Sequence, residues 1–133
     1  MKNRRDSMCF ACGEDNPIGL HLSFSVLSED EIQTNFVVKE EHQSYDGMMH
    51  GGLMAVLLDE VMGKLLSLKG LYAPTAKLEI RYRKEVCVGE KLTIYGRIVS
   101  MRGRMIEMEA KTEQADGNIA AEAKGKFMKT DRN

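Results

Sequence analysis

The stretch from His50 to Leu66 constrains the fold more than any other part of the chain. It reads His-Gly-Gly-Leu-Met-Ala-Val-Leu-Leu-Asp-Glu-Val-Met-Gly-Lys-Leu-Leu, an apolar run interrupted by few charges. At about 100° per residue its apolar side chains point in almost every direction, which predicts one helix buried on most of its faces. We expect this helix to end near Lys69-Gly70, because glycine is a typical helix stop.

The polar residues of this helix fall on different faces. Glu60, Lys64 and Ser67 share one narrow stripe, which we expect to face solvent. Asp59 lies off that stripe, among small and apolar residues three, four and seven positions away, so we expect it at or near a largely enclosed surface. Because a buried carboxylate without a partner is costly, Asp59 is the first candidate for a functional group.

The helix begins with two glycines, which are poor helix formers. The first N–H groups of a helix have no partner within it, and the helix dipole makes that end mildly positive. Glycine lets an anion or a polarised carbonyl approach the backbone closely. We therefore predict that the Gly52 N–H stabilises an oxyanion, that Gly51 permits the approach, and that Asp59 acts as base or nucleophile in an acyl transfer.

The spacing of these groups predicts a dimer. Gly52 and Asp59 are seven residues apart in the sequence, or about 10 Å along a helix axis, whereas reacting groups lie about 3–3.5 Å from one another. Two antiparallel copies of the helix, related by a two-fold axis, would place Gly52 of one chain near Asp59 of the other. We expect a homodimer with two shared sites, and a dimer of dimers is left open.

These motifs carry a resemblance to a known family. His-Gly-Gly, five residues, then Leu-Asp-Glu and Met-Gly resembles the hotdog-fold acyl-CoA thioesterases of the PaaI-like type. The opening Cys9-Phe10-Ala11-Cys12-Gly13-Glu14-Asp15-Asn16-Pro17-Ile18-Gly19-Leu20 is similar to the N-terminal signature of the thioesterase-superfamily-member branch of the same group. The resemblance implies hydrolysis of an acyl- or aryl-CoA thioester to the free acid and coenzyme A, with no cofactor besides the coenzyme A of the substrate.

The resemblance also implies roles for two residues. His50 would help to position the acyl carbonyl, and Thr75, sixteen residues after Asp59, would orient the attacking water. Two rival functions stay open. One is a non-catalytic module that binds acyl-CoA or lipid in the same pocket. The other is an enoyl-CoA hydratase, which is disfavoured because His21 lies four residues after Pro17 where the hydratase signature has two.

The rest of the chain predicts an α+β hotdog fold, a curved antiparallel sheet around one long central helix. We expect a single domain over residues 1–133, with residues 1–20 as an N-terminal extension. Strict alternation, or a return after a turn, predicts six strands. They are His21–Val26, Ile32–Val38, Thr75–Val88, Leu92–Met101, Met105–Gln114 and Ile119–Met128. Short turns join the last four, so we expect an antiparallel meander from Thr75 to Met128.

Substrate-binding residues are predicted from position. Tyr45, Met48 and Met49 lead into His50 and are placed to line a substrate entrance. The phosphates of coenzyme A require cations, and several basic residues alternate outward on a strand or lie in a turn. These candidates are Arg81, Arg83, Lys84, Arg102 and Arg104.

The composition limits the binding partners and the cellular location that we expect for this protein. Lys and Arg number 19 and Asp and Glu number 20, which gives no reason to expect nucleic acid or an anionic membrane as a partner. No apolar run reaches membrane-spanning length, and Met1–Asp6 lacks the apolar core of a signal peptide. Three cysteines predict a reducing cytoplasm. Cys9 and Cys12 have the spacing of half a zinc site, but no second pair follows, so we expect no metal.

Overall fold

One helix forms the centre of the computed structural model, which describes residues 6–131. Helix α1 spans Gly51–Leu68, with His50 as its N-cap and Lys69 as its C-cap. Gly70 follows with φ +80°, a left-handed conformation that glycine adopts at little cost. The predicted helix and its stop are confirmed. The side chains that α1 buries all contribute to the core: Met54, Leu57, Leu58, Val61, Met62, Leu65 and Leu66.

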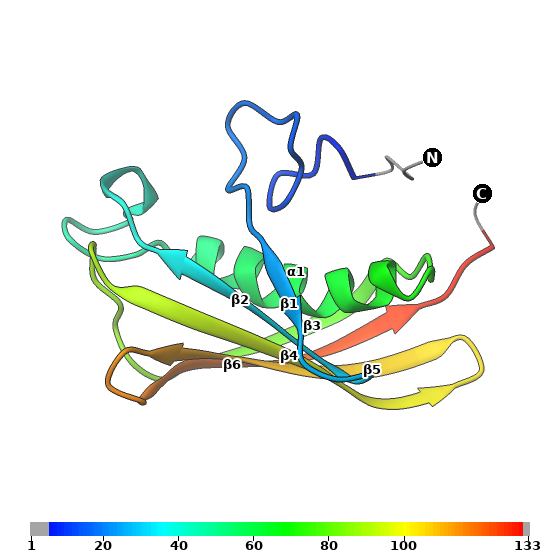
Figure 1. The fold of residues 1–133 in the computed structure, drawn as a ribbon. Coiled ribbons are helices and arrows are strands. Elements are labelled where there is room, and N and C mark those ends of the chain that lie inside the picture. The colour runs from blue at the N-terminus through cyan, green and yellow to red at the C-terminus, as the bar shows by residue number, and fades with distance from the viewer. Residues whose placement is uncertain (1–5, 132–133) are drawn as a thin grey trace.

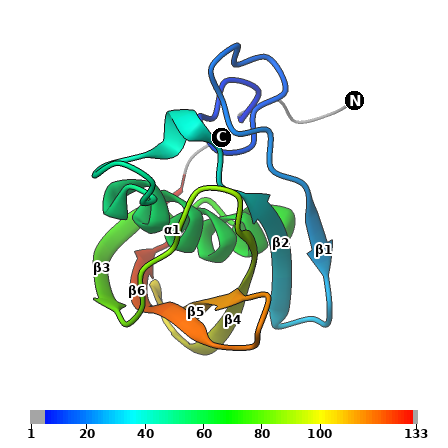
Figure 2. The ribbon, with the colours of Figure 1, turned by 90° about the vertical axis from the view of Figure 1, so that its left-hand side faces the viewer.

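A curved sheet of six antiparallel strands wraps around α1 (Figures 1 and 2). Its strands are β1 (Phe24–Val26), β2 (Glu31–Val37), β3 (Thr75–Tyr82), β4 (Lys91–Arg102), β5 (Met105–Gln114) and β6 (Ile119–Met128), and a 3₁₀ turn η1 (Glu40–His42) precedes the helix. The order across the sheet is β1-β2-β4-β5-β6-β3. The predicted α+β arrangement, a curved antiparallel sheet around one long helix, is confirmed.

The sheet order corrects one prediction. Strands β4, β5 and β6 form a meander, but β3 pairs with β6 and lies at the edge of the sheet. The reason is that α1 crosses the concave face between β2 and β3, so the chain leaves one side of the sheet and resumes at the other. The next strand, β4, then returns to pair with β2.

Two strands are shorter than predicted. Strand β3 ends at Tyr82 because the backbone then turns away, with the N–H groups of Arg83 and Lys84 both donating to Ala120 O. Strand β1 begins at Phe24, since His21 adopts φ +52° and interrupts the extended backbone. By contrast, β5 and β6 have the predicted bounds, because glycines at positive φ, Gly103 and Gly117, mark the turns at which they begin.

Residues 6–22 lie on the side of α1 that faces away from the sheet (Figures 1 and 2). They cover the stripe that was expected to face solvent. Glu60 and Lys64 are half-buried there, and Lys64 Nζ contacts Asp6 Oδ2 at 2.9 Å, whereas Ser67 is exposed as expected. The helical period shows which residues share a face, but it cannot show that a segment more than 40 residues away covers that face. None of the helices in residues 6–131 combines the length and apolar character that crossing a membrane requires.

Candidate active site

One strip of α1 is left partly open to solvent, and we call it the active strip because it carries the predicted catalytic residues. Gly51 and Gly52 are exposed, and Ala55, Asp59 and Gly63 are half-buried along the same strip. The prediction that Asp59 lies at a largely enclosed surface is therefore not met within a single chain. Apart from Asp59, the residues of the strip are glycine and alanine. Their small size lets another backbone or a ligand approach the helix closely.

Asp59 and Thr75 meet at this strip. The Thr75 hydroxyl donates a hydrogen bond to Asp59 Oδ1 at 2.7 Å. Thr75 is the first residue of β3, and an irregularity in the pairing of β3 with β6 follows it directly. A hydrogen bond to a carboxylate is roughly twice as strong as one between neutral groups, so it fixes the orientation of the Asp59 side chain. It also leaves Oδ2 available for a water molecule or a substrate.

The start of α1 differs from the prediction in one respect. His50 caps the helix, and its Nδ1 accepts a hydrogen bond from the Gly52 N–H at 2.8 Å. The Gly52 N–H, which was predicted to stabilise an oxyanion, is thus already hydrogen-bonded to the His50 imidazole of its own chain. Within residues 6–131 the Gly51 N–H has no hydrogen-bond partner, so Gly51 offers the open donor at this helix end. Because Nδ1 is an acceptor here, Nε2 is the ring nitrogen left to donate.

Tyr82 also holds the helix start, a contact that the sequence did not reveal. Its hydroxyl donates to Gly51 O at 2.6 Å, and burial raises the pKa of this hydroxyl. Tyr82 is the last residue of β3, so β3 contacts the active strip at both ends, through Thr75 and through Tyr82. The alternation of β3 indicated only that Tyr82 shares a face with Ile80, not that it reaches a backbone carbonyl on α1.

The predicted substrate entrance is only partly supported. Tyr45 is exposed and Met48 is half-buried, but Met49 is buried in the core with 7% of its surface exposed. The prediction for Met49 is wrong because its N–H donates to Val86 O, which turns its side chain inward. A groove of about 1090 Å³ instead lies beside the helix start, lined in part by His50, Gly52 and Leu53. Phe10 and Leu20 of the N-terminal segment also line it.

The predicted basic residues do not form one cluster. All five are exposed. Arg81, Arg83 and Lys84 follow one another near the end of β3 that contacts Gly51, and Arg83 Nε pairs with Glu122 Oε1 at 2.5 Å. Arg102 and Arg104 flank the β4–β5 turn. Arg104 binds Lys129 O and Asp131 there, at the Thr75 end of β3, about 20 Å from Arg81 along the strand.

Known proteins provide an independent comparison. A sequence profile described as the thioesterase superfamily matches residues 46–121, which contain α1, all of the active strip and Thr75. Acyl-coenzyme A thioesterase THEM4 from Bos taurus is 29% identical over 90 residues, which cover 67% of this chain and 37% of that protein. The chain therefore spans little more than a third of the length of this relative.

Solved structures show the same fold. A thioesterase superfamily protein has a TM-score of 0.83 at 29% identity, covering 94% of this chain and 63% of that one. A hypothetical thioesterase from Streptococcus pneumoniae TIGR4, solved with coenzyme A, has a TM-score of 0.76 at 21% identity, covering 84% and 88%. That protein has also been solved with an aspartate and with a threonine replaced by alanine. The chain described here belongs to the thioesterase superfamily.

Proposed function

We propose that this protein hydrolyses an acyl- or aryl-CoA thioester to the free acid and coenzyme A. The observation that carries the proposal is the Asp59 carboxylate, fixed by the Thr75 hydroxyl on the open strip of α1. Membership of the thioesterase superfamily supports it, as do the name of the cattle relative and the coenzyme A bound to the Streptococcus pneumoniae protein. The two residues replaced in that protein are sixteen positions apart, the same separation as Asp59 and Thr75.

In the proposed mechanism, Asp59 activates a water molecule that attacks the thioester carbonyl, or attacks that carbon itself. Thr75 holds Oδ1 of the carboxylate, so Oδ2 faces the reacting atoms. Negative charge then develops on the carbonyl oxygen, and the C–S bond breaks as the coenzyme A thiolate leaves. A helix N-terminus stabilises such an oxyanion, and we assign this role to the Gly51 N–H with His50 Nε2 beside it.

The donor and the acid come from different chains in this proposal. Gly51 and Asp59 are eight residues apart on α1, about 12 Å along its axis. Strand β3 lies at the edge of the sheet, and the backbone of an edge strand can pair with another chain. Pairing of β3 with β3 of a second copy would bring the two active strips together around a two-fold axis. We propose a homodimer with two shared sites.

The position of the basic residues favours one part of the predicted coenzyme A site. Arg81, Arg83 and Lys84 lie at the helix-start end of β3, where Arg81 and Arg83 reach the outer face of the sheet, so we propose that they bind phosphate groups at the rim of the site. Arg104 lies at the other end and would serve only a site formed with the second chain. All three cysteines are free thiols, as in reducing compartments, and we propose a cytoplasmic location.

Release of free thiol from a panel of acyl-CoA and aryl-CoA substrates tests the function. We expect hydrolysis of at least one class, and a loss of about 10²–10⁴-fold in kcat for Asp59→Asn, with coenzyme A binding retained. Asp30→Asn, which changes an exposed carboxylate in the β1–β2 turn, is the matched control and should match wild type. Binding without thiol release across the panel would favour the non-catalytic module. Formation of 3-hydroxyacyl-CoA from enoyl-CoA would favour the hydratase.

A further inference from the structure

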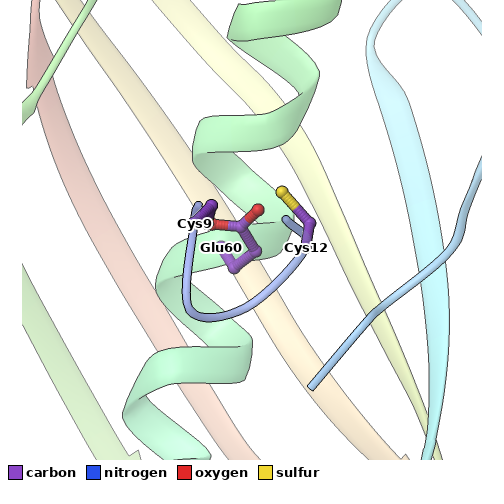
Figure 3. Close-up of side chains that lie close together, drawn as sticks. All are labelled: Cys9, Cys12 and Glu60. Atoms are coloured by element: carbon purple, nitrogen blue, oxygen red, sulfur yellow. The ribbon is translucent and has the colours of Figure 1, made fainter. Parts of the chain in front are cut away.

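A second group of reactive side chains lies on a neighbouring face of α1, about 100° around the helix from Asp59. Cys9 and Cys12 belong to the segment that covers the helix, and Glu60 extends from α1 between them (Figure 3). One ligand atom from each residue lies within 4.8 Å of those of the other two, and all three residues are half-buried. Cys9 Sγ is 3.7 Å from Glu60 Oε1. The proposed hydrolysis uses none of these groups.

These distances suit a single tetrahedral metal ion. Zinc lies about 2.3 Å from thiolate sulfur and about 2.0–2.2 Å from carboxylate oxygen, so two of its ligand atoms are about 3.5–3.8 Å apart. The contact between Cys9 and Glu60 falls in this range. A further carboxylate oxygen, Asp6 Oδ2, lies 3.9 Å from Cys12 Sγ. Small side-chain rotations would bring the Cys9, Cys12 and Glu60 ligand atoms around one centre, with a fourth position left for Asp6 or a water molecule.

The choice of metal follows from the ligand types and the charge. Two thiolates select soft or borderline ions, and two sulfurs with carboxylate oxygen in a tetrahedral arrangement suit zinc. Two thiolates and one carboxylate around Zn²⁺ carry one net negative charge. The Lys64 ammonium, 3.8 Å from Cys12 Sγ, offsets this charge. The same lysine holds Asp6 at 2.9 Å, which keeps that carboxylate beside the cluster.

The arrangement fits a redox pair of cysteines less well. A reactive dithiol requires an electropositive surrounding that stabilises the thiolate, whereas here the Glu60 carboxylate lies beside both sulfurs and the nearby Lys64 ammonium is paired with Asp6. Burial, together with the Glu60 carboxylate, raises the pKa of the Cys12 thiol well above its usual range, and burial raises the pKa of Glu60.

We propose that Cys9, Cys12 and Glu60 bind one zinc ion, with Asp6 or a water molecule as the fourth ligand. The sequence offered only two ligands, because the third comes from a helix about 50 residues away. The ion would join the covering segment to α1 at the residue next to Asp59, and so act structurally. The proposal does not depend on thioester hydrolysis.

Metal binding by the full chain is the test. The protein is reduced with a phosphine, stripped with a chelator, and titrated with zinc against a chromophoric competitor and with cobalt as a spectroscopic probe. We expect one metal per chain, with a thiolate-to-cobalt charge-transfer band. Cys12→Ser should remove most of that band. Glu60→Gln should keep it but weaken zinc binding by at least about 10–100-fold, the range that even outer partners of a ligand contribute.

The control is Cys87→Ser, which removes the third, exposed thiol, remote in sequence from the cluster. It should bind metal as wild type does. Zinc at a hundredfold excess over its Kd should raise Tm by roughly 5–15 °C in wild type and Cys87→Ser, and by less in Cys12→Ser. Equal zinc affinity in wild type and Cys12→Ser would overturn the proposal. So would the absence of a thiolate band in reduced wild-type protein, a result that needs no variant and leaves the proposed hydrolysis untouched.

Discussion

The hydrogen bond between Thr75 and Asp59 allows a sharp test of how the carboxylate works. Thr75→Val keeps the shape of the side chain and the preference for a strand but removes the hydroxyl that donates to Asp59 Oδ1 at 2.7 Å. A hydrogen bond to a charged group contributes about 1.5–3 kcal/mol. If this hydrogen bond stabilises the transition state and not the bound substrate, its loss lowers kcat by about 10–150-fold, at 1.36 kcal/mol per factor of ten.

Steady-state thiol release measures this change. We expect KM to stay within about threefold of wild type. The reason is that Thr75 orients the Asp59 carboxylate and does not contribute to binding of the substrate in its ground state. Thr75→Ser should restore most of kcat, since it keeps the hydroxyl. Thr93→Val is the matched control. Thr93 also lies in a strand and donates to a side-chain oxygen, that of Asn35 at 3.2 Å, but away from the strip.

Two results would refute the reasoning. One is wild-type turnover in Thr75→Val. The other is equal loss in Thr75→Val and Thr75→Ser, which would point to packing and not to the hydroxyl. A double-mutant cycle adds a further check, because Thr75→Val should cost almost nothing once Asp59 is already asparagine.

Two predictions concern the helix start. Gly51→Pro removes the proposed oxyanion N–H at a first helical position, where proline is tolerated and where the preceding His50 is already extended at ψ 128°. It should lower kcat by about 10²–10³-fold without changing urea unfolding, and turnover near wild type would exclude Gly51 as the donor. Tyr82→Phe removes a neutral hydrogen bond to Gly51 O and should lower kcat about 2–10-fold. Tyr95→Phe, on β4, serves as its control, and a similar loss in both variants would contradict the role of Tyr82.

Local patterns accounted for most of the fold. The apolar run from His50 predicted α1, because consecutive apolar residues indicate a helix that is buried on most of its faces. Strands β5 and β6 were bounded by alternation and by turn glycines at positive φ. The edge position of β3 could not be predicted in this way, since strand pairing depends on where α1 returns the chain and not on the residues of β3 themselves.

The candidate site likewise combines features that local sequence predicts with features that it does not. Asp59 was found because its position on an apolar helix is unusual, and Thr75 because its position matches related enzymes. The hydrogen bond from Gly52 to His50 Nδ1 depends on a ring rotamer, which no periodicity encodes. Glu60 was placed in solvent because its neighbours Cys9 and Cys12 come from a distant segment. A contact between distant segments therefore accounts for the error at Glu60, and a local side-chain rotamer accounts for the error at Gly52.

The central claim is that each active site combines Asp59 of one chain with the Gly51 N–H of the other chain. Asp59→Asn and Gly51→Pro chains with different tags, co-expressed and purified as the mixed dimer, test it directly. Each parent homodimer lacks one group in both sites, whereas the mixed dimer retains one site with both groups. The account predicts about half of the wild-type kcat per dimer. A mixed dimer no more active than its inactive parents would show that both groups act within a single chain.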